Sequence, residues 1–265
     1  MRLGFVTDVH WTTGQPGYLA WHNRWDFEGL PERLAATAGH LAETDLVVLS
    51  GDISSGGDLD SIAHVLGELG GVPVVAVTGN HDVDEGEGVL AAAVSDGSAL
   101  AQPAGVVHGP LRVAGVQVMA SDGGYAMVVG PETAAWGDGL AVFVSHFPAI
   151  SRAELFAEHD FKYPGDLRDR EALLERLAAR SAPTVVLCGH IHARDSHAEG
   201  AVLQLVGGAL IEAPYECAIV DVDAEALTVS REARPLGGPE VERTPVFAPE
   251  RETWRFDGLV WTSSR

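Results

Sequence analysis

The most informative part of this sequence reads Val72-Pro73-Val74-Val75-Ala76-Val77-Thr78-Gly79-Asn80-His81-Asp82. A run of strand-forming residues stops there at a glycine, and an amide, an imidazole and a carboxylate come immediately after it. Such a turn is weak support for a functional site when it stands alone, because turns favour Gly, Asn and Asp for backbone reasons. Its meaning depends on the residues at the ends of the other strands.

Four further polar motifs come directly after short apolar runs that are typical of buried strands. They are Asp8-Val9-His10, Gly51-Asp52, Ser145-His146 and Gly189-His190-Ile191-His192. A chain with 11 histidines could place a few of them after strands by chance. Chance does not account for all five motifs together, and we interpret them as one constellation.

The first part of the chain alternates between strand and helix patterns. Strands are predicted over 2–8, 46–49 and 72–78, and helices over 30–42 and 59–69. This order predicts parallel pairing of the three strands. In open α/β sheets ligands bind outside the carboxyl ends of the strands. We therefore expect Asp8, Asp52 and Asn80 to share one crevice.

The remainder of the chain is predicted to mix hairpins, strands and helices. Helices are predicted over 86–100 and 166–180, short hairpins over 106–119, and strands over 140–144, 184–188, 202–206, 218–222 and 226–230. The tail after Pro235 contains three more prolines, together with Trp254 and Trp261. We interpret residues 1–234 as one α/β domain and residues 235–265 as an irregular extension packed on it.

Composition describes a folded protein with a strong acidic excess. Hydrophobic residues make up 46% and charged residues 21%, and 17 Lys and Arg stand against 38 Asp and Glu, for a formal net charge of -21. This charge disfavours a nucleic-acid polymer or an anionic membrane as the main partner. An anionic substrate would need a local reversal of the field, which bound divalent cations could supply.

The sequence also predicts a cytoplasmic location. The first motif, at Asp8, lies too close to Met1 to leave room for a signal peptide, and no apolar run approaches the roughly 20 residues of a membrane span. Two cysteines, Cys188 and Cys217, offer no disulfide framework and are expected to be buried thiols.

The motif residues have the right types for a pair of divalent metals. Two ions about 3.5 to 4 Å apart need a carboxylate that bridges them, with oxygen and imidazole ligands for the remaining positions. Asp52, alone after its glycine, is the natural bridge. The other motifs supply carboxylate, amide and imidazole groups, and Mn, Fe, Zn, Co or Ni would each accept such a set.

At this point the sequence resembles the calcineurin-like metallophosphoesterases, whose ordered motifs are D-x-H, G-D, G-N-H-[D/E], H and G-H-x-H. All five are present between residues 8 and 192. The resemblance implies a four-layer α/β sandwich in which two mixed β-sheets are flanked by helices. It also implies two metal sites that share one aspartate. The first would be held by Asp8, His10, Asp52 and His192, and the second by Asp52, Asn80, His146 and His190.

The resemblance further implies phosphoester hydrolysis by in-line attack of a hydroxide that bridges the metals. His81 would stabilise the phosphoryl charge or protonate the leaving oxygen, and Asp82 would orient His81. A histidine suits this role because it can carry a proton near pH 7.

Subfamily features favour a phosphodiesterase that acts on a small-molecule or nucleotide phosphodiester. Protein Ser/Thr phosphatases of the family carry D-R-G after the second motif and a glutamate after G-N-H, whereas this chain has neither. Purple acid phosphatases have a tyrosine ligand where this chain has Ser55. A phosphomonoesterase remains the alternative, and a non-catalytic metal-binding scaffold, as in the retromer subunit of this fold, is the less favoured one.

Two loops that leave motif strands could contact the substrate. The first holds His22, Asn23 and Arg24 beside the aromatic residues Tyr18, Trp21 and Trp25, and the second holds Tyr163. Loops at strand ends often bind ligands, but the aromatic side chains could equally cover the sheet. An unpaired edge strand late in the sandwich could support a homodimer.

Overall fold

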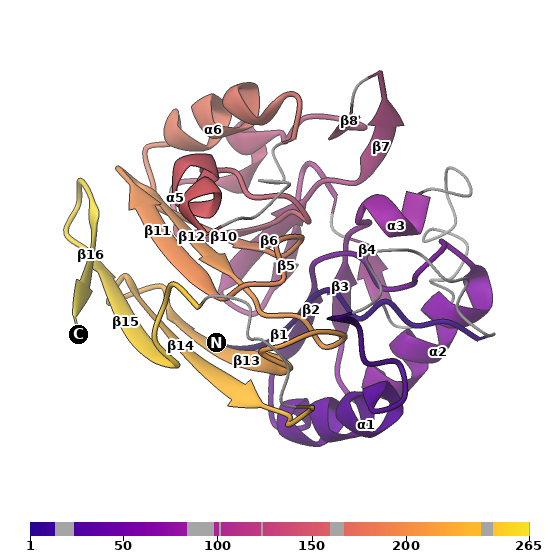
Figure 1. The fold of residues 1–265 in the computed structure, drawn as a ribbon. Helices are drawn as coiled ribbons and strands as arrows, with labels where there is room; N and C mark the ends of the chain where they lie inside the picture. The colour runs from indigo at the N-terminus through magenta and orange to yellow at the C-terminus, as the bar shows by residue number, and fades with distance from the viewer. Residues whose placement is uncertain are drawn as a thin grey trace.

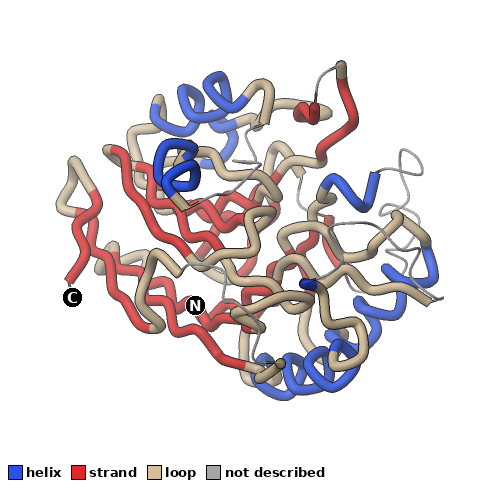
Figure 2. The backbone as a smooth tube through the Cα atoms, in the orientation of Figure 1, coloured by secondary structure: helices blue, strands red, loops and turns tan. Residues whose placement is uncertain are grey.

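The computed structural model describes residues 1–13, 24–83, 98–100, 102–122, 124–159, 167–239 and 246–264. Two mixed β-sheets pack face to face, and helices cover their outer faces, so that the molecule has four layers (Figure 1). The predicted four-layer α/β sandwich is therefore confirmed. Figure 2 shows the strands in the middle of the molecule with the helices outside them.

In the part of the chain that the structure describes, the first sheet has eight strands. From one edge to the other they are β16 (Trp261–Ser264), β15 (Arg251–Phe256), β14 (Thr228–Pro235), β13 (Glu216–Asp223), β1 (Arg2–Val6), β2 (Leu46–Leu49), β3 (Val74–Ala76) and β4 (Ser98–Leu100). β1, β2, β3 and β4 are parallel to one another, as the alternation of strand and helix predicted for the first three. From β1 to β16 the neighbouring strands are antiparallel.

Among the described residues, the second sheet has six strands, and a separate hairpin has two more. In sheet order the six are β11 (Asp195–Glu199), β12 (Val202–Val206), β10 (Thr184–Cys188), β9 (Ala141–Val144), β6 (Leu111–Gly115) and β5 (Val106–His108), and the hairpin consists of β7 (Val118–Ser121) and β8 (Gly124–Met127). β6, β9, β10 and β12 run parallel.

Helices occupy both outer layers. Within the described residues they are α1 (Leu30–Leu41), α2 (Leu59–Leu69), α3 (Asn80–Val83), α5 (Ala153–Glu158) and α6 (Arg170–Ala178), together with the 3-10 helix η2 (Thr133–Trp136). α1 and α2 lie on the first sheet, whereas α5 and α6 lie on the second (Figure 1). None of the helices within the described ranges is long and apolar enough to cross a bilayer.

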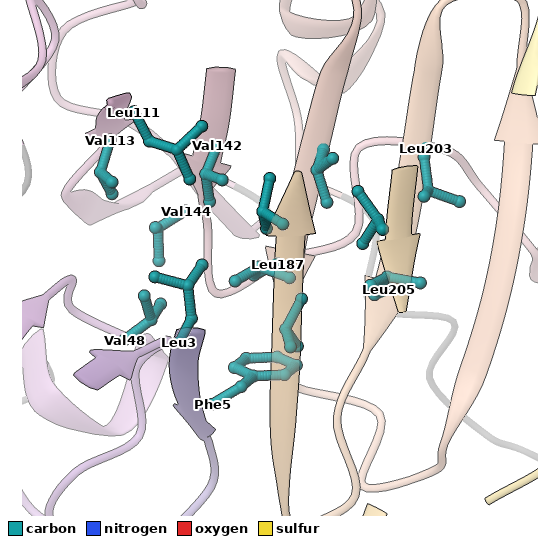
Figure 3. Packing of buried hydrophobic residues seen from close by; sticks show 14 of the residues in the cluster. Leu3, Phe5, Val48, Leu111, Val113, Val142, Val144, Leu187, Leu203 and Leu205 are labelled. Carbon is teal, nitrogen blue, oxygen red and sulfur yellow. The ribbon is translucent and has the colours of Figure 1, made fainter. Parts of the chain in front are cut away.

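Alternation along each central strand explains why the layers stack in this order. In β1, Phe5 points into the space between the sheets, and its neighbour Val6 packs toward α1 and α2. In β10, Leu187 faces the first sheet, and Val186 packs toward α5 and α6. Successive side chains of a strand point to opposite faces, so a fully apolar strand fills two layers at once. Figure 3 shows the inner layer, where Leu3, Phe5 and Val48 of the first sheet meet Leu187 and other residues of the second.

The C-terminal tail differs from the predicted irregular extension. Residues 251–256 and 261–264 form β15 and β16, which continue the first sheet beyond β14. The sequence pattern does not indicate a strand here because Glu252 is buried within β15, where its carboxylate pairs with the buried guanidinium of Arg231. A charged residue that points inward breaks the apolar and polar alternation by which a strand is predicted.

Two other predicted elements also differ from the structure. The helix predicted over 86–100 lies mostly outside the described residues, but its last part, Ser98–Leu100, is the strand β4, which pairs with β3. Sheet pairing outweighs helix propensity at that edge. The helix predicted over 166–180 is shorter, since α6 begins at Arg170 and ends at Ala178.

Candidate metal centre

Five strand ends bring the predicted motifs to one place. β1, β2 and β3 of the first sheet end just before Asp8, Asp52 and Asn80, whereas β9 and β10 of the second end before His146 and His190. Backbone hydrogen bonds join the ends, with Asp8 N donating to Gly51 O at 3.2 Å and Gly189 N donating to His146 O at 3.0 Å. The predicted motif residues are therefore brought together where the carboxyl ends of both sheets meet.

The backbone adopts a rare conformation at most of these positions. Asp8, His10, Asp52, His190 and His192 have φ values of +51°, +53°, +48°, +72° and +51°. Residues other than glycine seldom adopt this left-handed region, and each instance costs about 1 to 3 kcal/mol. Strain that coincides with five of the seven predicted ligands is typical of a site whose side chains are held in place for binding.

The first half of the centre contains Asp8, His10 and His192. Nε2 of His192 lies 3.4 Å from Oδ1 of Asp8 and 3.2 Å from Nε2 of His10. Asp8 is fully buried, and its carboxylate accepts hydrogen bonds from the Thr7 hydroxyl at 2.7 Å and from the His190 amide at 3.1 Å. The three candidate ligand atoms lie within 4.8 Å of one another, a spacing that one cation could occupy.

The second half contains Asp52, Asn80, His146 and His190. Nε2 of His146 is the centre of this group, at 3.2 Å from Oδ2 of Asp52, 3.1 Å from Oδ1 of Asn80 and 3.1 Å from Nδ1 of His190. On its other side, Nδ1 of His146 lies 2.9 Å from the Ser50 carbonyl oxygen. A carbonyl can only accept, so Nδ1 carries a hydrogen, and Nε2 is the nitrogen that points into the group and that a cation could bind in place of a proton.

Asp52 lies between the two halves. Its Oδ2 atom is 3.2 Å from Nε2 of His146 and 3.5 Å from Nε2 of His10, while Oδ1 accepts a hydrogen bond from the His81 amide at 2.9 Å. The side chain is buried, and it contacts one imidazole of each half. This is the position that a bridging carboxylate needs.

The protonation pattern shows that each half suits a cation. Burial lowers the pKa of His10 well below its ordinary value and that of His190 to about 3. Burial also opposes the charged form of His146 and His192, but Asp52 raises the pKa of His146 to about 9 and Asp8 raises that of His192 to about 10. Each half thus pairs one protonated imidazole with one neutral imidazole, and the proton takes the place that a cation would take. The donor set therefore fits divalent metal ions.

Two glycines allow the ligands to approach the backbone closely. A Cβ atom at Gly79 would collide with the Asp52 carboxylate, and one at Gly189 would collide with the Thr7 hydroxyl and the Asp8 carboxylate. Glycine is the one residue that leaves room at these two turns.

His81 lies beside the centre, as predicted, but Asp82 does not orient it. The His81 ring meets the His10 ring edge-on at 4.7 Å, and its Nδ1 lies 3.2 Å from the Ser55 carbonyl oxygen. The two Asp82 oxygens are used by the amides of Gly79, Ile53 and Ser54 and by the Ser54 hydroxyl. The expected pairing of Asp82 with the ring is therefore corrected: Ser55 orients the ring, and Asp82 holds the turn that carries it. Burial and the nearby Asp52 charge raise the pKa of Asp82 to about 6.

Of the four predicted substrate-binding residues, only Arg24 lies within the described residues. His22, Asn23 and Tyr163 lie outside the described residues. Arg24 is half-exposed, and its guanidinium lies 3.7 Å from the carboxylate of Glu212, which places it at the rim of the first half.

Two residues near the centre were not identified as site residues from the sequence. The half-buried Trp25 lies against His10, with 4.2 Å between the ring centroids. Glu212 lies 3.2 Å from Nδ1 of His192. Trp25 was placed only in an aromatic cluster that could equally have covered the sheet, and Glu212 belongs to no motif, so only the folded chain brings it to the site.

Fold and site together define a candidate metal centre at the carboxyl ends of two packed sheets. The chain belongs to the calcineurin-like phosphoesterase family, whose model matches residues 1–194. The predicted family membership is therefore confirmed.

Comparisons with individual proteins agree with the family. The chain is 28% identical over 88 residues to a probable cyclic nucleotide phosphodiesterase of Xenorhabdus bovienii, a match that spans 32% of this chain and 35% of that relative. A dimetal phosphatase from Danio rerio has a similar fold, with a TM-score of 0.65, 15% identity, and coverage of 89% of this chain and 96% of that one. A purple acid phosphatase from yellow lupin seeds, Lupinus luteus, has a TM-score of 0.56, 14% identity, and coverage of 91% and 52%.

Proposed function

We propose that this protein is a dinuclear phosphodiesterase that hydrolyses a small-molecule or nucleotide phosphodiester. The observation that carries the proposal is the position of Asp52 between two clusters of candidate ligands, Asp8 with His10 and His192, and His146 with His190. Two bound divalent cations would polarise the phosphate and acidify a water molecule for attack on phosphorus. The family supports divalent metal ions at such a site.

The chain's own residues would bind the phosphate and deliver a proton. His81 is partly exposed at the centre, and its Nδ1 is turned toward a carbonyl acceptor, so Nε2 is the nitrogen left to face a substrate. In its protonated form, the ring can give the Nε2 proton to the leaving oxygen. Arg24, at the rim, can pair with a phosphate oxygen that faces away from the ligand cluster.

Charge favours a diester over a monoester. A phosphate monoester carries about -1.5 to -2 charges at pH 7, whereas a diester carries about one. The centre already contains the carboxylates of Asp8 and Asp52, with Glu212 beside them, in a chain of formal net charge -21. Two bound dications would offset these carboxylates at the centre, so the remaining discrimination comes from the acidic chain around it, which repels the less anionic ester less. The likeness to a probable cyclic nucleotide phosphodiesterase points the same way.

We expect chelator-stripped protein to regain hydrolysis of a bis-aryl phosphate when Mn, Fe, Zn, Co, Ni or Mg is added back singly. The kcat/KM for the diester should exceed that for the matching mono-aryl phosphate by roughly tenfold or more, which corresponds to about 1.4 kcal/mol of transition-state stabilisation. Initial rates with both substrates measure this ratio. A preference for the monoester would instead favour the phosphatase alternative. No turnover with any metal, despite bound ions, would favour a scaffold.

A further inference from the structure

A carboxylate outside the five motifs reaches the first half of the centre. Glu212 lies in the connection between β12 and β13, and its side chain is 10% exposed. The backbone amides of Leu210 and Ile211 in the same connection approach the carbonyl oxygen of Asp8, at 3.2 and 3.4 Å. The connection is therefore fixed against the predicted metal ligand Asp8 just before it delivers Glu212.

One oxygen of Glu212 contacts His192. Oε2 lies 3.2 Å from Nδ1 of the ring, while Nε2 on the opposite side faces Asp8 at 3.4 Å and His10 at 3.2 Å. An ionised carboxylate can only accept a hydrogen bond, so the hydrogen of the imidazole lies on Nδ1. Nε2 is thereby the nitrogen directed at the candidate ligands of the first half, and replacing its proton by a cation would give the tautomer and ring orientation that metal ligation requires.

The other oxygen of Glu212 contacts Arg24. Oε1 lies 3.7 Å from Nη1 of the guanidinium, which is about half exposed. The segment that carries Arg24 is tied to the same connection, because Asp26 N donates to Ile211 O at 2.8 Å and Arg33 Nε donates to Leu210 O at 2.7 Å. An isolated ion pair on the surface would contribute little to the stability of the folded protein. Here, however, the acidic partner is mostly buried and also contacts a candidate ligand.

We propose that Glu212 is a positioning residue for the reaction, which holds His192 toward the first metal and holds Arg24 at the rim of the same metal. This role rests on the proposed function. It couples the first metal site to a guanidinium available for the substrate phosphate, through a residue that belongs to none of the five motifs.

The direct test is metal binding, which does not depend on turnover. Calorimetric titration of stripped protein with Mn²⁺ or Co²⁺ should show two ions per wild-type chain. Glu212→Ala should weaken one of the two sites by about 10- to 100-fold, the usual effect of removing an outer partner of a ligating histidine, and should leave the other site unchanged. Glu212→Gln should show a smaller loss at the same site, because the amide oxygen can still accept from Nδ1.

Matched variants separate this role from a general effect of charge or folding. Glu232→Ala removes a partly exposed glutamate on β14 that pairs with Arg234 and Arg251, and it should leave both metal affinities unchanged. Arg24→Ala should also keep both affinities while raising KM for the diester more than it lowers kcat. Thermal unfolding checks that each variant is folded, and if Glu212→Ala fails to fold, Glu212→Gln carries the test.

Equal affinities in wild type and both Glu212 variants would overturn the proposal. So would an equal loss at both sites, which would indicate a structural role. A wild-type chain that binds only one ion would contradict the dinuclear centre instead. The change in affinity for that one ion in Glu212→Ala would still decide the role of Glu212.

Discussion

Asp52→Asn is expected to weaken metal binding at both sites and to lower phosphoester hydrolysis by at least about 10³-fold. Asp52 Oδ2 lies 3.2 Å from His146 and 3.5 Å from His10, one imidazole in each half of the centre. An amide keeps the size of the side chain but loses its charge and one acceptor oxygen. Removing an outer partner of a metal ligand already costs 10- to 100-fold in affinity, so the loss of a shared ligand should exceed that at each site.

Metal content per chain after dialysis against a fixed free-metal concentration measures this effect. Asp195→Asn is the matched control, because Asp195 is also buried but pairs with Arg152 rather than with the predicted ligands. The control should retain both ions. If Asp52→Asn loses one ion and keeps the other at full affinity, Asp52 is not a bridge.

His81→Ala is expected to lower kcat for the diester by about 10² to 10⁴-fold while both metal ions stay bound. The His81 ring lies against His10, and its Nδ1 faces the Ser55 carbonyl at 3.2 Å, so the ring is oriented from outside the ligand set. A proton donor lowers the barrier of the chemical step, and its loss should therefore appear in kcat rather than in metal affinity.

The metal measurement matters here because the position of His81 also permits ligation. One ring nitrogen of His81, one ring nitrogen of His10 and one carboxylate oxygen of Asp52 lie within 4.8 Å of one another. A fall in metal content in His81→Ala would identify it as a ligand, and unchanged turnover would remove it from the mechanism. His64→Ala, on the exposed side of α2 where the ring stacks on Trp11, is the control and should change neither quantity.

The strands that carry the motifs could be predicted because their signals are local. β1, β2 and β10 are continuous apolar runs bounded by polar turns, and the strand–helix order sets their parallel direction. Parallel strands of one sheet end at the same edge. Asp8, Asp52 and Asn80 could therefore be placed together without knowledge of any side-chain contact.

The parts that could not be predicted depend on contacts between distant segments. β11, Asp195–Glu199, has a largely polar sequence, and its buried Asp195 is paired with Arg152, about forty positions earlier in the chain. The buried Glu252 of β15 is paired in the same way, with Arg231. Glu212 has no local signal at all. Each of these residues looks solvent-exposed in sequence, and only its partner explains its burial.

The orientation of His81 was mispredicted for a related reason. The resemblance to the family implies that the acid after this histidine orients it, but in the short helix α3 the carboxylate of Asp82 turns back to the amides of Gly79, Ile53 and Ser54. Backbone amides at the start of α3 and in the turn after β2 attract the carboxylate, and neighbouring positions on a helix point in different directions. The backbone therefore competes successfully for Asp82.

Anomalous diffraction from crystals grown with Mn²⁺ or Co²⁺ would test the central claim most directly. Two peaks about 3.5 to 4 Å apart are predicted, with the Asp52 carboxylate between them, one beside Asp8, His10 and His192 and the other beside Asn80, His146 and His190. A single peak at full occupancy, or two peaks of which only one contacts Asp52, would contradict a dinuclear centre built on this aspartate.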